Sequence, residues 1–176
     1  MKKINVNETV TRDGLVYHQD TNEPVTGILE EFHDNGQLEM RQNCIDGELD
    51  GLFERFDENG QLWMRSNFID RVQNGLLETF HPNGQLKRKI SFKDGKEDGP
   101  SENFNENGQL SHRINYIDGE LTGPFERFYS NGHLEFRGNV LDGKIEGLGE
   151  FFDEYGNLTM TRTFRNGVQV ETNEYH

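Results

Sequence analysis

The sequence has little of several things that a compact domain usually contains. Its 176 residues include one cysteine, four prolines and one tryptophan, and hydrophobic residues make up only 31% of the chain. The single cysteine, Cys44, excludes an intrachain disulfide and a cysteine metal cluster. The low hydrophobic content argues against a thick central core and favours thin layers in which each unit covers its neighbour. The aromatic content of 11% argues against a disordered polar tract.

Long apolar segments are also missing. No stretch approaches the apolar length that a membrane-spanning helix needs. Residues 1–7 carry positive charge, but no apolar run follows them, which argues against a secretory signal. The cytoplasm is therefore the expected location.

Basic residues are scarce relative to acidic ones. There are 18 Lys and Arg against 32 Asp and Glu, which gives a formal net charge of -14. Such a surface repels nucleic acid and anionic membrane and favours basic partners. Solubility alone explains the charge equally well at this level.

Glycine reveals the organisation of the chain, because 17 of the 20 glycines fall into three columns with a step of 24 residues. The columns are Gly36, Gly60, Gly84, Gly108, Gly132 and Gly156; Gly27, Gly51, Gly75, Gly99, Gly123 and Gly147; and Gly47, Gly95, Gly119, Gly143 and Gly167, with Arg71 in the gap. A fixed period of this size indicates an array or solenoid.

Other residue types follow the same step. The columns are Phe32, Phe56, Phe80, Phe104, Phe128 and Phe152; Leu38, Leu62, Leu86, Leu110, Leu134 and Leu158; Glu30, Glu54, Glu78, Glu102, Glu126 and Glu150; and Arg41, Arg65, Lys89, Arg113 and Arg137, ending at Thr161. Each copy consists of two strand-like segments and two turns, and such short connections permit only antiparallel neighbours. The expected fold is all-β: an antiparallel β-hairpin repeat array with a 24-residue period, as a single elongated, twisted or curved meander sheet or a solenoid.

Two hairpin registers fit the Asn-Gly turn. It forms either a two-residue type I′ loop or a three-residue loop with glycine in the left-handed bulge position. Pro82 in the third copy favours the second register, since its fixed φ suits position i+1 of a type I turn. That register pairs Phe32 with Leu38 on one face.

The same register predicts the buried face. By alternation we expect Cys44 and its equivalents to join the Phe and Leu columns there; these are Phe68, Phe92, Tyr116, Val140 and Phe164. The Glu column shares this face, with each carboxylate bonded to turn amides or paired with a neighbouring Arg or Lys.

The ends of the chain depart from the repeat, as capping segments do. We expect residues 1–26 to form a degenerate N-terminal capping hairpin, residues 27–170 to hold six repeats, and residues 171–176 to be a C-terminal tail. Val168 to Val170 form the expected final strand.

The sequence contains no motif that carries catalysis or binds a cofactor. The histidines have no metal-ligand spacing, and the Walker, Rossmann and nucleophile-elbow patterns are absent. Cys44 stands in a core column, so it is expected to be a buried thiol. The turn acids Asp94, Glu97 and Asp98 permit a calcium interpretation, but Asp before Gly is ordinary turn chemistry. We expect a chain that is not an enzyme and that binds neither metal nor cofactor.

Residues that vary between copies are the candidates for partner binding. Phe53, Arg55, Trp63 and Arg65 are expected to cluster on the face opposite the Phe column, and Phe125 and Arg127 lie further along the chain. Aromatic side chains beside arginine are typical binding anchors. The alternative is that these aromatics cover the second face of a curved sheet. The acidic group of Asp94, Glu97 and Asp98 completes the predicted site.

The unit G-x-x-x-x-F-x-x-N-G-Q-L-x-x-R-x-x-[FY]-x-D-G resembles the variant MORN repeat. The match covers Gly27 to Gly167, and its clearest carriers are Phe56 with Asn59 to Leu62 and Phe104 with Asn107 to Leu110. Arg71, Tyr155 and Thr161 depart from the pattern. Chains built wholly of this unit look like the YwqK family of bacterial antitoxins. The motif consists of turn and core residues, so it defines no binding residues that could be transferred.

The resemblance implies an immunity protein that neutralises a cognate toxin, such as a basic nuclease or deaminase. An acidic chain could block a basic cleft and associate with it quickly by electrostatic steering. The competing hypothesis is a MORN-type scaffold or adaptor in a protein assembly or near a membrane. We expect no nucleic acid partner, a monomer or a homodimer through the sheet ends, and little membrane binding.

Overall fold

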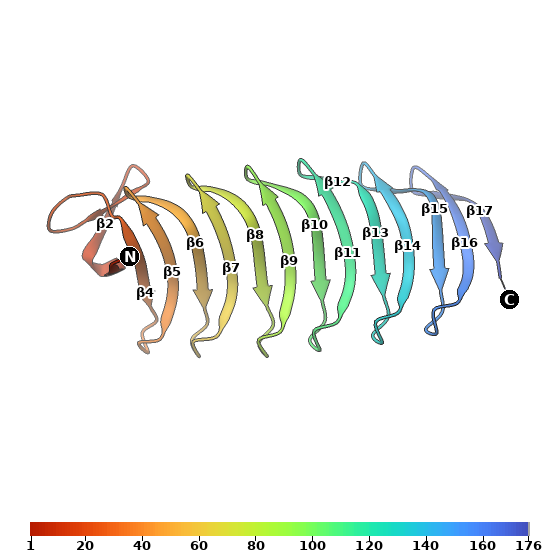
Figure 1. The fold of residues 1–176 in the computed structure, drawn as a ribbon, viewed down its shortest axis with the longest axis horizontal. Coiled ribbons are helices and arrows are strands. Elements are labelled where there is room, and N and C mark those ends of the chain that lie inside the picture. The colour runs from red at the N-terminus through yellow and green to blue at the C-terminus, as the bar shows by residue number, and fades with distance from the viewer. Residues whose placement is uncertain (176) are drawn as a thin grey trace. The chain divides into compact units, whose positions relative to one another are not determined.

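The computed structural model describes residues 1–175, and these form an all-β chain (Figure 1). The strands recur with the 24-residue step of the glycine columns, so the predicted array of antiparallel β-hairpins is confirmed. Residues 1–84 and 92–95 form one compact unit, called unit 1, and residues 85–91 with those from 96 onward form unit 2. Strand β9 (Leu86–Lys93) contributes residues to both units.

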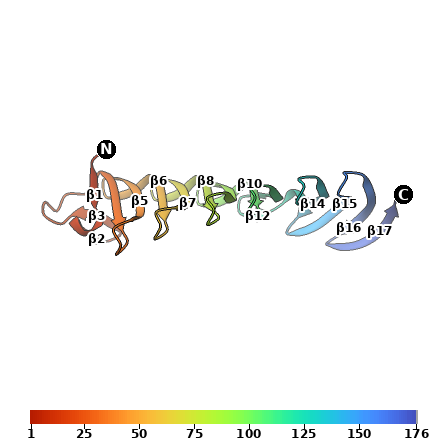
Figure 2. The same cartoon turned by 90° about the horizontal axis from the view of Figure 1, so that it is seen from below.

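Unit 1 contains a sheet with the strand order β1-β4-β5-β6-β7-β8, and a separate pair of strands, β2 and β3 (Figure 2). The strands are β1 (Lys3–Asn5), β2 (Thr9–Arg12), β3 (Leu15–His18), β4 (Gly27–Phe32), β5 (Leu38–Ile45), β6 (Glu48–Phe56), β7 (Leu62–Ile69) and β8 (Val72–Phe80). A 3-10 turn, η1 (Val6–Glu8), follows β1. β1 runs parallel to β4 and so covers the edge of the first repeat.

Unit 2 contains a sheet with the strand order β10-β11-β13-β14-β15-β16-β17, and the short β12 also pairs with β11. The strands are β10 (Lys96–Phe104), β11 (Leu110–Ile117), β12 (Glu120–Leu121), β13 (Gly123–Phe128), β14 (Leu134–Leu141), β15 (Lys144–Phe152), β16 (Leu158–Arg165) and β17 (Val168–Glu174). These pairs are antiparallel, as the short connections require.

The hairpin tips adopt the three-residue loop. The amide of Gly36 donates to the carbonyl of His33 at 2.8 Å, and the amide of His33 donates to the carbonyl of Gln37 at 2.9 Å. Gly36 has a φ of +83°, the left-handed value that this bulge position needs. Gly84 repeats the bond to His81, so Pro82 stands at position i+1 as predicted.

The opposite ends of the strands are joined by two-residue turns. Ile45 pairs directly with Glu48, and both residues between them, Asp46 and Gly47, have positive φ, as a type I′ turn requires. The amide of Gly47 also donates to the carbonyl of Val25 in the preceding copy, at 2.8 Å. The same bond, 22 residues back, is made by Arg71, Gly95, Gly119, Gly143 and Gly167. Each turn is therefore anchored by its backbone to the repeat before it.

One face of the sheet carries the glutamate and arginine columns, and we call it the ladder face. Arg41 lies opposite Glu30 with 2.9 Å between Nη2 and Oε1, and its Nη1 is 3.6 Å from Glu54 on the next strand. The Arg41 guanidinium also lies 5.9 Å from the ring centre of Phe56. In unit 2, Arg113 bridges Glu102 and Glu126 in the same way, at 2.8 and 3.1 Å. The glutamate column is thus paired with basic side chains, one of the two roles predicted for it.

The predicted face of Cys44 is wrong. Phe32 does pair with Leu38, but the register then shifts, and Glu31 pairs with Met40 rather than with Glu39. The bulge adds one residue to the returning strand, so alternation counted from Leu38 is reversed beyond it. Cys44, opposite Gly27, therefore lies on the other face from the Phe column. The same shift follows Arg55, Asn103, Arg127 and Phe151 in later copies.

The face opposite the ladder holds the buried apolar side chains of the repeats, and we call it the core face. In unit 1, Val25, Leu29 and Cys44 are buried together with Ile4 from the capping segment. In unit 2, Phe136 is 3% exposed and lies between Phe125 and Phe151, with ring centres 5.6 and 4.9 Å away.

The last strand begins where the sequence predicts it but runs further. β17 extends to Glu174, so residues 171–174, expected in a tail, are paired with β16 instead. Glu171 stands where the earlier copies have a glycine with positive φ, such as Gly147. Without that glycine the register differs: Thr161 pairs with Asn173, whereas Arg137 pairs with Glu150 one repeat earlier.

Candidate protein-binding surface

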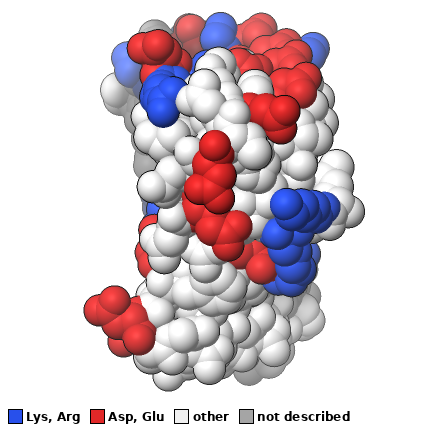
Figure 3. All heavy atoms as spheres, turned by 90° about the vertical axis from the view of Figure 1, so that its left-hand side faces the viewer, with Lys and Arg blue, Asp and Glu red and all other residues white. Residues whose placement is uncertain are grey.

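Charge is unevenly distributed over the surface of the chain. Figure 3 looks onto the β1 end and shows many acidic side chains, with a few basic ones among them, along the upper edge, which is the edge of the two-residue turns in Figure 1. The exposed aspartates at these turns include Asp46 and Asp70 in unit 1. The structure therefore places much of the acid excess at strand ends, where it is accessible to a partner.

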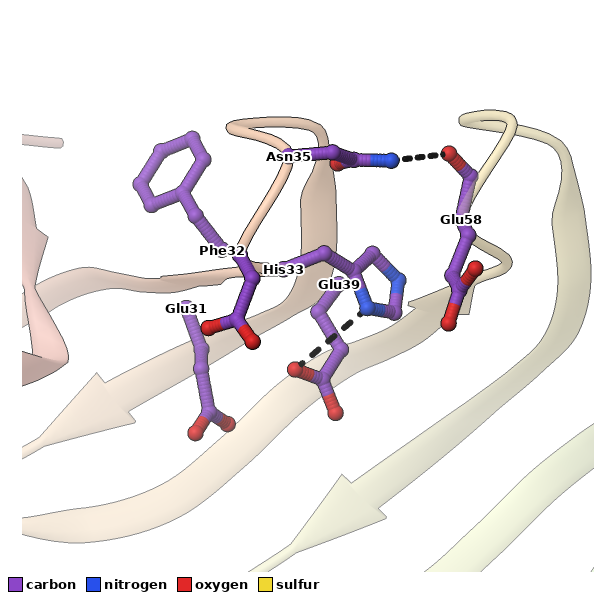
Figure 4. Close-up of a pocket in the computed structure, with 7 residues that line it drawn as sticks. Glu31, Phe32, His33, Asn35, Glu39 and Glu58 are labelled. Carbon is purple, nitrogen blue, oxygen red and sulfur yellow. Dashed lines mark hydrogen bonds and ion pairs between the residues drawn. The ribbon is translucent and has the colours of Figure 1, made fainter.

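A hollow of about 430 Å³ lies beside the tip of the first hairpin (Figure 4). It is lined by Glu31, Phe32, His33, Asp34, Asn35, Glu39 and Glu58. The tip is tied to the next repeat, because Asn35 Nδ2 donates to the carbonyl of Glu58 at 2.7 Å. His33 Nε2 lies 3.0 Å from the carbonyl oxygen of Phe56, and its Nδ1 lies 3.7 Å from Glu39 Oε2. We call this hollow the tip hollow.

The chemistry of the tip hollow suits a cation. Four of its seven lining residues are carboxylates, and none is Lys or Arg. The ring of Phe32 is 43% exposed and points away from the imidazole of His33 in Figure 4. Carboxylates and an open aromatic face are the groups that bind an ammonium or guanidinium side chain. These carboxylates were not among the predicted site residues, because the hollow forms only where two hairpin tips meet.

Two of the four residues predicted to cluster in unit 1 do lie together. Phe53 and Arg55 are on the core face, opposite Ser66 and Met64. The Arg55 guanidinium lies 5.9 Å from the ring centre of Phe53, which itself contacts Phe68 edge-on. Phe53 therefore contributes to packing as well as to a surface.

The other two residues lie elsewhere. Arg65 is on the ladder face opposite Glu54, where it pairs with Glu78 at 2.8 Å and lies over the ring of Phe80. Trp63 lines a separate hollow of about 220 Å³ together with Phe80 and Pro82. The predicted cluster of four is thus wrong: the sheet divides it, because Arg65 belongs to the column that forms the ladder.

Phe125 and Arg127 are brought together in unit 2. Both line a small hollow of about 110 Å³ on the core face, along with Phe136, Ile145, Phe151 and Phe164. Arg127 forms two hydrogen bonds to the carboxylate of Glu135, at 2.7 and 2.8 Å. Its guanidinium is therefore neutralised locally and held at the rim of an aromatic surface.

The three predicted turn acids have different roles. Asp94, in unit 1, accepts a hydrogen bond from Asn74 at 3.3 Å. Asp98, in unit 2, accepts one from the amide of Asp118 at 3.5 Å. Glu97 lies 3.4 Å from Arg88 on the core face. Asp94 and Asp98 thus hold turns, as ordinary turn chemistry predicts.

Glu97 is part of a polar cluster that the sequence analysis missed. Arg88 also approaches the hydroxyl of the buried Ser101 at 3.5 Å. Burial, followed by the charge of Arg88, lowers the pKa of His112. Burial and the charge of Glu97 raise the pKa of Tyr116. The sequence does contain a sign of this cluster, because the residue type changes at one position of the repeat. Arg88 and His112 stand where the first two copies have methionine.

Within residues 1–175, no group of three or more His, Cys, Asp or Glu side chains is arranged to hold a metal ion. In the same residues, no helix has the length and apolar character to cross a membrane.

Comparison with known proteins identifies the repeat. The profile of the family described as MORN repeat variant matches residues 25–43, 49–70, 73–94, 97–118 and 121–142, more than half of the chain. No curated protein matches the chain. Among solved structures, similarity is found to Staphylococcus aureus TarM, in a point mutant bound to fondaparinux, alpha-GlcNAc-glycerol and UDP, and in a second TarM structure. Both are 16% identical over 55% of this chain, with TM-scores of 0.39 and 0.38, and the match spans 19% of the TarM chain.

Proposed function

Because the chain belongs to the MORN repeat variant family, we propose that it is a non-catalytic repeat protein that binds another protein. MORN repeats are in general protein- or membrane-binding repeats. In its specific form, the proposal is an immunity protein that neutralises a cognate basic toxin in the bacterial cytoplasm.

The observation that supports a basic partner most directly is the tip hollow. It combines four carboxylates with the exposed ring of Phe32, and neither Lys nor Arg lines it. A lysine or arginine side chain from a partner would satisfy the carboxylates and lie against the ring. The net charge of -14 would speed the encounter with such a partner by electrostatic steering.

The first experiment tests protection in the native host. The gene is deleted, and any toxin-like gene beside it is expressed from a plasmid, with and without the restored gene. We expect growth arrest without the gene and rescue with it. Equal growth in both strains would contradict the immunity role.

A second experiment tests the contribution of the tip hollow. Glu39→Lys combined with Glu58→Lys should weaken binding to that toxin by at least about tenfold, because both charges line the hollow. Glu171→Lys combined with Glu174→Lys is the matched control, since it changes the net charge equally on the exposed strand β17. If both pairs weaken binding equally, general charge rather than the hollow attracts the partner.

A further inference from the structure

Four aliphatic side chains stand exposed at one equivalent position of the repeat, directly before the two-residue turn. They are Ile45 and Ile69 in unit 1 and Ile117 and Leu141 in unit 2, and they are between 42% and 55% exposed. We call these four residues the aliphatic row. Single exposed apolar residues are common, but the same exposed position in four of six copies is not a random scatter.

The aliphatic row lies on the ladder face. Along β14 the side chains alternate regularly, so Leu141 is on the same face as Arg137, four residues earlier. Ile69 pairs across its turn with Val72, which is 44% exposed. Leu148 precedes Glu150 by two residues on β15, shares its face, and is 55% exposed. Each unit thus carries two members of the row and further exposed aliphatic side chains on the same face.

Local strand preference does not account for these residues. Threonine is also β-branched and fits an exposed strand position without placing an aliphatic group in water. Hydrophobic residues make up only 31% of this chain. The residues of the aliphatic row are nevertheless exposed to solvent, whereas the polar Ser101 and Thr161 are buried. A surface that covers the aliphatic row would remove this cost.

The border of the aliphatic row is acidic in both units. The row's position holds Lys93 in the remaining copy of unit 1 and Arg165 in that of unit 2. The other charged residues at these turns are Asp46, Glu48, Asp50, Asp70, Asp94 and Arg71 in unit 1, and Lys96, Asp98, Asp118, Glu120, Asp142, Lys144 and Glu146 in unit 2. Acidic side chains thus outnumber basic ones at the border in both units. A hollow of about 420 Å³ in unit 2 is lined by Glu120, Leu121, Asp142 and Gly143. The border therefore disfavours anionic lipid or a second copy of this acidic chain, and favours a partner with Lys or Arg.

The spacing of the row indicates the shape of the partner. Neighbouring members within a unit are two strands apart, about 9.5 Å at the usual strand separation. Residues seven apart on an α-helix are separated by about 10.5 Å and lie on nearly the same face. We propose that in each unit the two members of the aliphatic row and their acidic border bind an amphipathic basic helix of a partner protein. This rests on the proposed function and specifies the element of the partner that is recognised.

The test uses two synthetic peptides with the same composition of leucine and lysine. In the first, leucines recur so that they form one face of a helix; in the second, the order is scrambled. Binding to the full chain is measured by titration calorimetry. We expect the amphipathic peptide to bind at least about tenfold more tightly than the scrambled one.

The second arm locates the site. A variant that combines Ile45→Ser, Ile69→Ser, Ile117→Ser and Leu141→Ser removes the row from both units and should weaken binding of the amphipathic peptide by about tenfold or more. Tyr155→Ser is the control, because Tyr155 is 76% exposed at a hairpin tip, away from the row. The Tyr155→Ser variant should bind the amphipathic peptide as tightly as the native chain does. All four substituted positions of the row are exposed, so circular dichroism should show an unchanged fold.

Several outcomes would overturn the inference. Equal binding of both peptides would show charge attraction alone, and an unchanged affinity of the variant with all four serine substitutions would place the peptide elsewhere. Binding to phosphatidylcholine vesicles, lost in that variant, would assign the row to a membrane. Self-association of the native chain, lost in that variant, would assign it to a second copy. Growth rescue in the host tests the immunity role separately, so failure of the peptide test leaves that result standing.

Discussion

The two faces of the sheet differ in which positions repeat and which are buried. On the ladder face the Glu, Arg and Phe columns recur almost unchanged, yet Phe32 is 43% exposed. On the core face one column changes from Leu29 to Phe53 to Ser101, yet Leu29 and Ser101 are almost fully buried. Identical repetition in this chain therefore marks contacts between neighbouring copies, whether the residue is exposed, as Phe32 is, or buried, as Glu30 is. The buried positions of the core face vary in residue type.

The physical reason lies in what each face needs. An ion pair such as that of Arg41 with Glu30 and Glu54 requires the correct partner in the next copy, so the residue type must recur. Packing on the core face requires only that the volumes fit, and several combinations of side chains achieve this. This difference between the faces predicts that substitutions on them lower the free energy of unfolding by different amounts.

The largest effect is expected on the core face of unit 2. Phe136→Ala removes a ring that is 3% exposed and contacts two other rings, so it should lower the free energy of unfolding by about 3–5 kcal/mol. Thermal or urea denaturation measures this loss. A loss below about 1 kcal/mol would mean that this face is not the core.

A smaller effect is expected for the repeated Phe column. Phe56→Ala removes a half-buried ring and its contact with the Arg41 guanidinium, so the loss should be about 1–2 kcal/mol. The same denaturation experiment compares the two variants directly. If Phe56→Ala costs more than Phe136→Ala, the assignment of the faces is reversed.

The smallest effect is expected from titration of the ladder. Burial opposes ionisation of Glu30, but hydrogen bonds from Lys3 and Arg41 outweigh it and hold the pKa of that carboxyl below its ordinary value. A carboxyl with a lowered folded pKa contributes stability above its unfolded pKa, near 4.5, and that stability is lost as pH falls through the folded pKa.

The pH dependence can be assigned to Glu30 by substitution. Denaturation midpoints are measured between neutral pH and pH 3 for the native chain and for Glu30→Gln. The variant should lose less stability than the native chain across that window. Identical pH profiles for the two proteins would show that Glu30 is not held ionised by its neighbours.

The repeat and its turns could be predicted from the sequence, because glycine and proline report backbone conformation directly. Pro82 selected the three-residue loop, and the 24-residue step gave the succession of hairpins. Which residues lie on which face of the sheet could be predicted only in part. The bulge after Glu31 arises from the hydrogen-bond register of the two strands, and no particular residue type marks it in the sequence. One extra residue moved Cys44 to the opposite face and divided the predicted cluster around Trp63.

The candidate site was predictable only in part. Phe125 and Arg127 were found because their types stand out within their columns, and the structure brings them together. The tip hollow combines Glu39 with Glu58 from the next hairpin, and the polar cluster joins Arg88 to Ser101. Such groupings depend on which strands are neighbours and which way each side chain points. Composition and spacing contain neither piece of information.

Thiol reactivity tests the division between the two faces most directly. Cys44 is fully buried on the core face, and burial raises the pKa of its thiol, so it should react with a thiol reagent only on unfolding. Phe32→Cys in a Cys44→Ala background places a thiol on the ladder face, where the native ring is 43% exposed. The account predicts rapid labelling of this variant and protection of the native chain. Equal labelling rates for the two folded proteins would contradict it.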